Sequence, residues 1–375
     1  MHVLVVDDSA VVRHTVSTLL TQESDITVDA ASDPFIGMRK MAERRPDVIL
    51  LDIEMPRMDG LTFLRKIMSE DPVPVVICSA LTGPGLYDSV RALELGAVDI
   101  VGKPKVGLQE FLYESSVTLL DALRAAARAH VLRRSDPAQK ASVVAAPARS
   151  ALHSSRPGID PVIAIGASTG GTDAIRELLA PMPPHCPGIV IVQHMPEMFT
   201  GAFARRLNEL CAVEVREAQD GDEVCSGQVL IAPGNRHMRV HRQGIKYAVQ
   251  VVDGPLVARH RPSVNVLFSS VAAAARENAV GIILTGMGDD GAEGLLEMRR
   301  AGATTIAQDE KSCVVFGMPG KAIARGAVDF VLPLDQIASA ALREASSTAS
   351  MEIEPPSNPS TGNATRASRW RAPRM

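Results

Sequence analysis

The first third of the chain alternates short apolar runs with amphipathic stretches. The runs are continuous and rich in β-branched residues, a pattern typical of strands buried on both faces, and they cover residues 3–6, 26–30, 48–51, 73–78 and 98–101. Between the runs, apolar residues recur at helical spacing, as at Leu61, Leu64 and Met68. Five β/α units with short connections predict a parallel, doubly wound α/β sheet, in which ligands bind at the carboxyl ends of the strands.

The rest of the chain divides by composition. Residues 124–160 are rich in Ala, Arg, Ser and Pro, which predicts a linker whose first half could prolong a helix beginning near Leu108. From about Ser346 the chain turns to Ser, Pro, Thr and Asn, which predicts a disordered tail. The predicted organisation is a first domain at residues 1–123, a linker at 124–160, a second domain at 161–345 and a tail at 346–375.

Length and composition agree with two globular domains, since 375 residues exceed one typical domain. Hydrophobic residues make up 46% of the chain, but no apolar run approaches the roughly 20 residues of a membrane helix. The N-terminal residues lack the basic flank and cleavage site of a signal peptide, so a cytoplasmic protein is expected. The five cysteines are scattered and form no CxxC, which predicts neither a disulfide framework nor a zinc site.

The net charge of −4 is unevenly distributed along the chain. Residues 1–123 hold 11 Lys and Arg against 19 Asp and Glu, a net charge of −8. Residues 161–345 hold 17 basic against 20 acidic residues, a net charge of −3, and show no basic stripe. Because DNA binding needs such a stripe to contact phosphates, nucleic acid is not an expected partner.

Five polar residues follow strands of the predicted first sheet, namely Asp7, Asp8, Asp52, Ser79 and Lys103. Three carboxylates at one sheet edge repel one another unless a hard cation shares them, which favours a Mg²⁺ site. An ammonium and a hydroxyl group at the same edge would suit phosphate oxygens. Any one of the acidic residues could simply be a solvated turn former, but this alternative does not account for all five positions together.

This segment resembles a response-regulator receiver domain, which has a flavodoxin-like fold, and the loop DIEMPRMDGL and the step Lys103-Pro104 agree with that family. The resemblance implies phosphorylation of Asp52, Mg²⁺ binding by Asp7, Asp8 and Asp52, and phosphate contacts from Ser79 and Lys103. Many receivers carry Tyr or Phe three positions before the lysine, where this chain has Ile100. We therefore expect no aromatic switch at that position.

The second domain opens with VIAIGASTGGTDAI, an apolar strand that breaks into glycines and then a helix. Gly166-x-Ser168-x-Gly170 places a serine in a tight strand-to-helix turn, which suits a nucleophile. Alternatively, Ser168 or Thr169 could only cap the helix, or the glycines could bind a nucleotide phosphate. The phosphate alternative is weak, because the Walker lysine and the GxGxxG spacing are both missing.

A histidine and two carboxylates follow later strands of the second domain. His194 comes directly after the apolar run 188–193, and the strand at 280–285 leads into Asp289 and Asp290. A lone histidine is more often structural, and the acidic pair could merely favour a helix dipole. A serine, a histidine and an aspartate that each follow a parallel strand can also meet as nucleophile, base and orienting group. Their order along the chain differs from that of the α/β-hydrolases.

Together with the receiver, the motifs IGASTGG, QHMP, APG, RPSVN and LTGMGDDG, in this order, resemble the chemotaxis protein-glutamate methylesterases, which are also glutamine deamidases. The resemblance implies a Rossmann-like catalytic domain with Ser168 as nucleophile, His194 as base, Asp290 as triad carboxylate, and Met287 and Thr169 as oxyanion or supporting residues. Asn265 stands where many relatives have Asp, and we assign it no catalytic role.

The family's activity is a phosphorylation-activated hydrolysis of glutamyl methyl esters on chemoreceptors. The resemblance thus implies chemoreceptors as substrates, a chemotaxis histidine kinase as phosphodonor, Mg²⁺ in the receiver and no cofactor in the catalytic domain. A linker of this length could let the receiver cover the catalytic edge until phosphorylation releases it. The alternative is a non-enzymatic docking module whose second domain has lost turnover.

Overall fold

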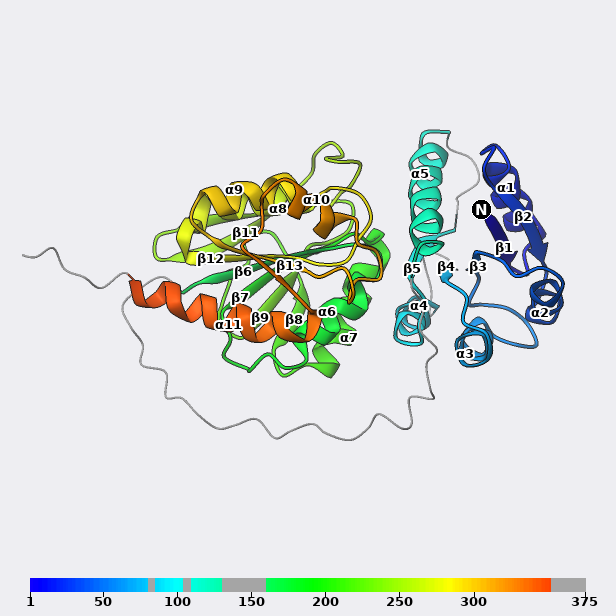
Figure 1. Ribbon diagram of the computed structural model, residues 1–375, viewed down its shortest axis with the longest axis horizontal. Coiled ribbons are helices and arrows are strands. Elements are labelled where there is room, and N and C mark those ends of the chain that lie inside the picture. The colour runs from blue at the N-terminus through cyan, green and yellow to red at the C-terminus, as the bar shows by residue number, and fades with distance from the viewer. Residues whose placement is uncertain (80–84, 104–108, 130–159, 352–375) are drawn as a thin grey trace, which may run out of the picture.

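The computed structural model describes residues 1–79, 85–103, 109–129 and 160–351. Two α/β domains lie side by side, each built around its own parallel sheet (Figure 1). The predicted fold class, two doubly wound parallel-sheet domains, is therefore confirmed. Within these described residues no helix combines the length and the apolar character needed to cross a membrane.

The first domain has a five-stranded parallel sheet in the order β2-β1-β3-β4-β5. Helices α1 and α5 cover one face and α2, α3 and α4 cover the other, because successive side chains of a strand point to opposite faces. The strands are β1 (His2–Val6), β2 (Thr27–Ala31), β3 (Val48–Leu51), β4 (Val75–Ser79) and β5 (Asp99–Gly102). The helices are α1 (Ala10–Leu20), α2 (Pro34–Glu43), α3 (Gly60–Glu70), α4 (Gly85–Glu94) and α5 (Gln109–Ala126).

The second domain has a seven-stranded parallel sheet in the order β14-β13-β12-β6-β7-β9-β8. Its strands are β6 (Val162–Ala167), β7 (Gly188–Gln193), β8 (Glu214–Glu217), β9 (Gln228–Ile231), β12 (Ala279–Ile283), β13 (Thr304–Gln308) and β14 (Phe330–Leu332). The chain order reverses between β6 and β12, and such a switch point is where sheets of this kind bind their ligands.

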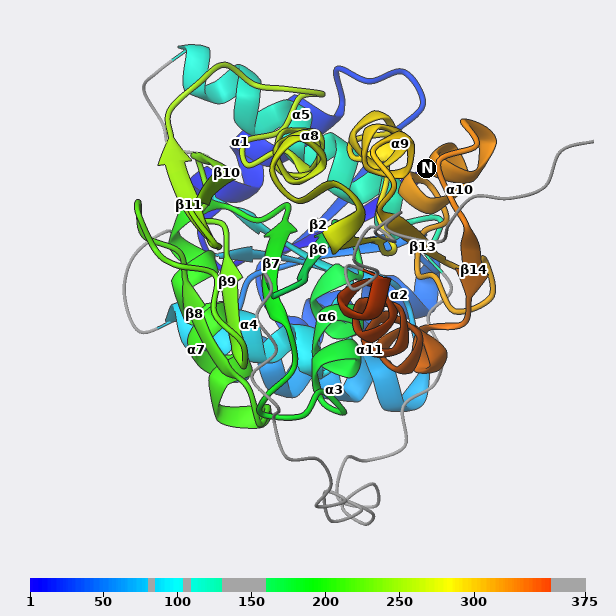
Figure 2. The ribbon, with the colours of Figure 1, turned by 90° about the vertical axis from the view of Figure 1, so that its left-hand side faces the viewer.

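Helices cover both faces of the second sheet (Figure 2). One face packs against α8 (Val264–Ala275), α9 (Ala292–Arg300) and α10 (Met318–Ala324), and the other against α6 (Gly171–Leu179), α7 (Glu197–Leu210) and α11 (Leu334–Met351). An antiparallel hairpin of β10 (His237–Gln243) and β11 (Lys246–Val252) lies outside the main sheet and contacts α8. The sequence patterns did not predict this hairpin.

Two predicted boundaries differ from the structure. Helix α5 continues to Ala126, beyond the predicted start of the linker, and residues 130–159 lie outside the described part of the chain. The prediction of a disordered tail from Ser346 is wrong for residues 346–351, which continue α11. The buried Ala345 anchors this helix, and Ser346 and Ser347 donate hydrogen bonds to backbone carbonyls four residues earlier. Residues 352–375 lie outside the description.

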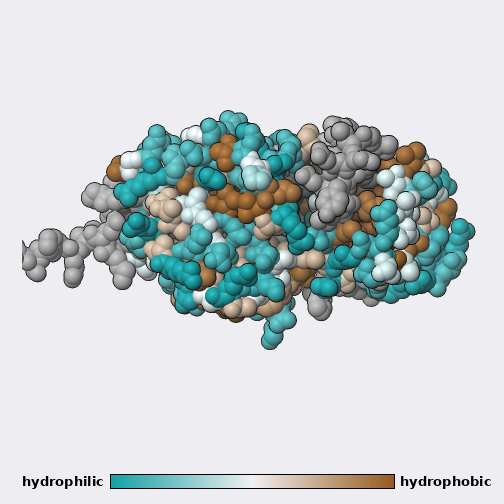
Figure 3. Space-filling view, turned by 90° about the horizontal axis from the view of Figure 1, so that it is seen from above, coloured by the Kyte–Doolittle hydropathy of each residue, from teal (hydrophilic) through white to brown (hydrophobic). Residues whose placement is uncertain are grey.

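The domains meet through β5, α4 and α5 of the first domain, which face the second domain in Figure 1. Helix α4 packs against α6 and α7. Figure 3 shows a largely hydrophilic face of the molecule with a band of apolar residues over the second domain. The contact between the two domains places β5 of the first domain next to the carboxyl edge of the second sheet.

Candidate active site

Ser168 lies in the turn between β6 and α6, at the switch point of the second sheet. Its backbone N–H donates to the carbonyl oxygen of Thr285 at 3.0 Å, and Nε2 of Gln193 donates to its carbonyl oxygen at 2.9 Å. Gly170 has a φ of 75°, a left-handed conformation that suits glycine. A Cβ atom on Gly286 would come within 2.7 Å of Cβ of Ser168. The glycines of both motifs therefore let two strand ends approach around the serine.

His194 and Asp290 are hydrogen-bonded in the same site. His194 follows β7, Asp290 follows β12, and Nε2 of His194 lies 2.8 Å from Oδ2 of Asp290. The Asp290 carboxylate also accepts hydrogen bonds from Oγ of Ser263 at 2.8 Å and from the N–H groups of Val264 and Asn265 at 2.7 and 3.0 Å. Burial raises the pKa of Asp290, but these hydrogen bonds and His194 outweigh burial and lower the pKa overall. Asp290 is therefore a fixed, ionised partner for the imidazole.

The structure separates the two adjacent carboxylates that the sequence left open. The side chain of Asp290 is fully buried, whereas that of Asp289 is 53% exposed and forms an ion pair with Arg325 at 3.5 Å. Only Asp290 contacts His194, as the family resemblance implied. The side chain of Asn265 instead accepts a hydrogen bond from the N–H of Gly294, so it contacts α9.

The other ring nitrogen of His194, Nδ1, is buried and has no hydrogen-bond partner among the described residues. Nε2 is engaged by Asp290, so Nδ1 is the ring nitrogen left to exchange a proton. The ring of His260 stacks on the His194 ring, with a centroid distance of 3.7 Å and an interplanar angle of 8°. Burial, with a further contribution from His194, lowers the pKa of His260, so His260 is neutral at neutral pH.

Sequence reasoning missed two residues of this site, His260 and Ser263. Both lie in or beside the motif RPSVN, which was recognised as a family signature without an assigned role. Ser263 caps α8 and contacts Asp290 at the same time, a double role that an N-cap position does not reveal from sequence.

A cavity of about 440 Å³ opens beside Ser168, between the two domains. Ser168, His194, Met287 and Thr169 line one side of it. Met287 and Thr169, the two residues predicted to support an oxyanion, thus lie on the same cavity as Ser168, the predicted nucleophile.

The first domain contributes groups to this cavity. Oγ1 of Thr169 donates to Oδ2 of Asp99 at 2.9 Å, and the N–H of Gly170 donates to the carbonyl oxygen of Val98 at 3.2 Å. Burial raises the pKa of Asp99 to about 6, against the opposing hydrogen bonds from Ile100 and Thr169. A carboxyl group of the first domain therefore lies against the residue that follows the nucleophile.

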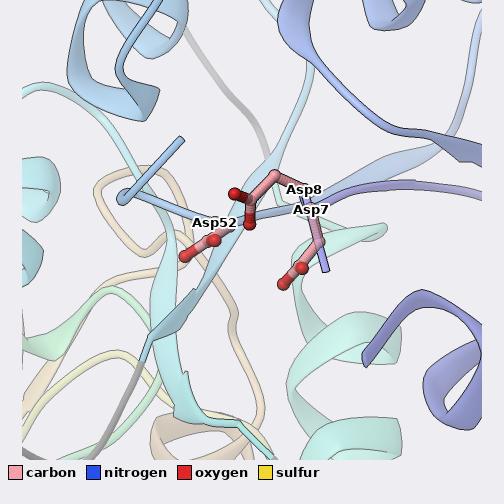
Figure 4. Close-up of side chains that lie close together, drawn as sticks. All are labelled: Asp7, Asp8 and Asp52. Carbon is pink, nitrogen blue, oxygen red and sulfur yellow. The ribbon is translucent and has the colours of Figure 1, made fainter. Parts of the chain in front are cut away.

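The second predicted site gathers the carboxylates of Asp7, Asp8 and Asp52 at the carboxyl edge of the first sheet (Figure 4). One ligand oxygen from each lies within 4.8 Å of the others. Nζ of Lys103 lies 2.7 Å from Asp52 and 3.0 Å from Asp7. Burial, with a further contribution from Asp7, raises the pKa of Asp52 to about 6. Three clustered oxygen donors with one ammonium partner leave negative charge that fits a hard divalent cation.

The remaining receiver residues lie as follows. Ser79 ends β4, and Oγ of Ser89 on α4 donates to its Oγ at 2.8 Å, which joins the strand end to the helix that faces the second domain. Ile100 is buried and lines the cavity between the domains. Pro104, the other half of the Lys-Pro step, lies outside the described residues.

The fold and the two sites define a class of protein: a response regulator whose receiver is joined to an α/β domain with a Ser-His-Asp arrangement. The family model for the response regulator receiver domain matches residues 3–112, and that for the CheB methylesterase matches residues 163–341. The chain belongs to the family of two-domain protein-glutamate methylesterases, because similar relatives span nearly its whole length.

Two of these relatives carry the name protein-glutamate methylesterase/protein-glutamine glutaminase. The protein from Anaeromyxobacter dehalogenans is 57% identical over an alignment that covers 92% of this chain and 96% of the relative. The protein from Geobacter metallireducens is 55% identical over an alignment that covers 91% of this chain and 98% of the relative. The methylesterase catalytic domain from Thermotoga maritima, a crystal structure, is 37% identical over 49% of this chain and 97% of its own, with a TM-score of 0.48.

Proposed function

We propose that this protein hydrolyses methyl esters of glutamyl side chains on chemoreceptors, that it also deamidates receptor glutamines, and that phosphorylation of its receiver activates it. The observation that carries this proposal is the buried pair of His194 and Asp290 at the sheet edge that also holds Ser168. The names of the relatives supply the substrate class. The direct test is methanol release from membranes that bear methylated receptor, with and without a small-molecule phosphodonor.

The site residues support an acyl-enzyme route. Nδ1 of His194 takes the proton of Ser168 while Oγ attacks the ester carbonyl, and Asp290 stabilises the imidazolium that forms. The proton then passes to the leaving group. A methoxide departs as methanol, and when the substrate is an amide the –NH2 group departs as ammonia. A water molecule activated by His194 finally releases the receptor carboxylate and restores Ser168.

Met287 and Thr169 are placed to stabilise the oxyanion of this reaction. Both line the cavity beside Ser168, and Thr169 begins the turn that leads into the N-terminus of α6. Backbone donors at such a helix start favour developing negative charge.

In the receiver, Asp7, Asp8 and Asp52 would hold Mg²⁺, with Asp52 as the phosphate acceptor and a chemotaxis histidine kinase as the physiological donor. Bound Mg²⁺ would neutralise charge between the acceptor and the incoming phosphate. Lys103 already contacts Asp52, and Ser79 ends the neighbouring strand, so both are placed to contact the phosphate. The catalytic domain needs no cofactor for this chemistry.

We expect the unphosphorylated receiver to limit access to the nucleophile and phosphorylation to release it. The physical basis of this expectation is that Asp99 and Val98 of the receiver accept hydrogen bonds from the turn that carries Ser168. A fragment beginning at Ser155 should hydrolyse methylated receptor faster than the unphosphorylated full chain and should not respond to a phosphodonor. Partial activation is the realistic outcome, because a shift from 1:99 to 99:1 requires about 5.5 kcal/mol. A fragment no faster than the unphosphorylated full chain would show that the receiver is a positive activator.

The contact of Asp99 also predicts a pH dependence of domain closure. Burial in the closed arrangement raises the pKa of this carboxyl group to about 6, and exposure to water on opening would move the pKa back toward the ordinary value of an aspartate. Asp99 therefore binds a proton more tightly in the closed arrangement than in the open one. Protonation of Asp99 favours closure at about pH 5, and this stabilisation of the closed arrangement is lost as the pH rises through 6. Hydrogen-exchange protection of the Gly170 N–H, corrected for intrinsic exchange, should be greater at about pH 5 than at about pH 7.5. Asp99→Asn should flatten this difference, and an equal pH response in the variant would contradict the assignment.

A further inference from the structure

The contact between the domains matches acidic groups of the receiver with arginines of the catalytic domain. Arg206 of α7 donates two hydrogen bonds to the carboxylate of Glu94 on α4. Its Nε lies 2.5 Å from Oε1, and its Nη2 lies 3.0 Å from Oε2. Glu209 holds the same guanidinium from within α7 at 2.8 Å. The hydrogen bonds that Arg206 donates to Glu94 raise the pKa of Arg206. Arg206 is thus fixed in place with its carboxylate-binding edge directed at the receiver.

A second arginine of the catalytic domain forms an ion pair with α5 of the receiver. Nη1 of Arg259 lies 3.3 Å from Oδ2 of Asp121 on α5, and Arg259 lines the same cavity as Ser168. Ala258 and Arg259 both have left-handed backbones, with φ values of 49° and 68°. Such conformations are uncommon for residues other than glycine and gather at functional sites, so the loop presents Arg259 at a cost in backbone strain.

Strand β5, which carries Asp99, lies between α4 and α5, which carry the acidic partners of the two arginines (Figure 1). Asp99 accepts a hydrogen bond from Thr169, the residue after Ser168. The receiver therefore offers one carboxyl group to Thr169, beside Ser168, and one carboxylate to each of the two arginines. Hydrolysis of a glutamyl ester leaves a carboxylate beside Ser168. The three acidic groups of the receiver therefore resemble a product carboxylate with an acidic neighbour on either side.

We infer that Arg206 and Arg259 are specificity residues that bind carboxylates on either side of the target glutamyl ester. This inference rests on the proposed function. The helix α4 already occupies the surface of α6 and α7 in this structure, which shows that the surface accepts a helix bearing an acidic side chain. The receiver and the substrate then compete for the same arginines.

The test uses the full chain activated with a phosphodonor and two synthetic helical peptides. Each peptide carries one glutamyl methyl ester, flanked a turn or two away on both sides by Glu in one peptide and by Gln in its twin. At low ionic strength, wild-type kcat/KM should favour the acidic peptide by about tenfold, mainly through KM, since each exposed ion pair contributes about threefold. Raising the salt concentration should remove the preference, because it screens partly exposed charges.

Arg206→Ala and Arg259→Ala should each lower the ratio of kcat/KM for the acidic peptide to kcat/KM for its Gln twin by about threefold. Arg206→Glu should lower this ratio further, because the new carboxylate repels the acidic peptide. Arg299→Ala is the matched control, since Arg299 pairs with Asp329 at 2.7 Å from the last turn of α9, at the opposite edge of the sheet. Glu94→Gln should raise the activity of the unphosphorylated chain and keep the preference of the activated chain, because Glu94 belongs to the receiver.

The outcomes separate this inference from the proposed function. Methanol release from both peptides without an acidic preference, or a preference that survives in the Arg206 and Arg259 variants, would overturn the inference and leave the esterase intact. Methanol release from neither peptide, nor from methylated receptor, would overturn the proposed function itself.

Discussion

Ser168→Ala and His194→Ala are each expected to lower methyl ester hydrolysis by about 10⁴-fold or more while the fold is kept. The reason is that nucleophile and base act as a unit: without Oγ no acyl-enzyme forms, and without the imidazole no group removes its proton. Both residues lie at strand ends in turns held by backbone hydrogen bonds, and their side chains are not part of the hydrophobic core. Circular dichroism and thermal unfolding should therefore remain close to those of the wild type.

Asp290→Asn should approach the same loss, because an amide cannot stabilise the imidazolium and favours the wrong tautomer of His194. Asp289→Asn is the matched control from the adjacent position, with the same change of charge. It should be mild, since the Asp289 side chain is half exposed and contacts Arg325 instead of His194. Methanol release from methylated receptor, measured for both variants after full activation, decides between them. A severe Asp289→Asn and a mild Asp290→Asn would show that the triad has been assigned to the wrong carboxylate.

The strand ends were predictable because parallel strands buried on both faces leave a continuous apolar run that stops where the polar residue begins. The run at residues 188–193 predicted β7 at its observed bounds and placed His194 directly after it. The same pattern predicted that Asp7, Asp8 and Asp52 lie together at one edge of the first sheet, as the structure shows. The hairpin of β10 and β11 escaped this logic because it packs on α8 instead of joining the parallel sheet.

Other features depend on contacts that no local pattern contains. Adjacent aspartates in GMGDDG carry the same chemistry, and only their contacts in the folded chain distinguish them: Asp290 is held by the N-terminus of α8, whereas Asp289 pairs with Arg325. The stacking of His260 on His194 joins two loops far apart in the chain. The contact of Asp99 with Thr169 joins two domains across the linker, so it follows from docking and not from either sequence segment alone.

Asp52→Asn is expected to abolish phosphorylation of the protein, and with it the activation of the esterase by a phosphodonor. Asp52 follows β3, the central strand of the sheet, and lies 2.7 Å from Nζ of Lys103, which supports its proposed role as the acceptor. Asparagine keeps the size of the side chain but removes the nucleophilic oxygen. Asp71→Asn is a suitable control, because Asp71 is exposed and pairs with Arg45 at the surface.

The same reaction should require a divalent cation. Without one, an incoming phosphate meets three carboxylates, of which Asp7 and Asp52 pair with Lys103, and this repulsion should reduce labelling to near zero. Bound Mg²⁺ reverses the local charge balance and brings donor and acceptor oxygens together. Labelling by a radioactive phosphodonor, with Mg²⁺ and with excess chelator, measures both effects. Persistent labelling of Asp52→Asn would place the acceptor elsewhere, and undiminished labelling in chelator would show that Asp7 and Asp8 have a role other than metal binding.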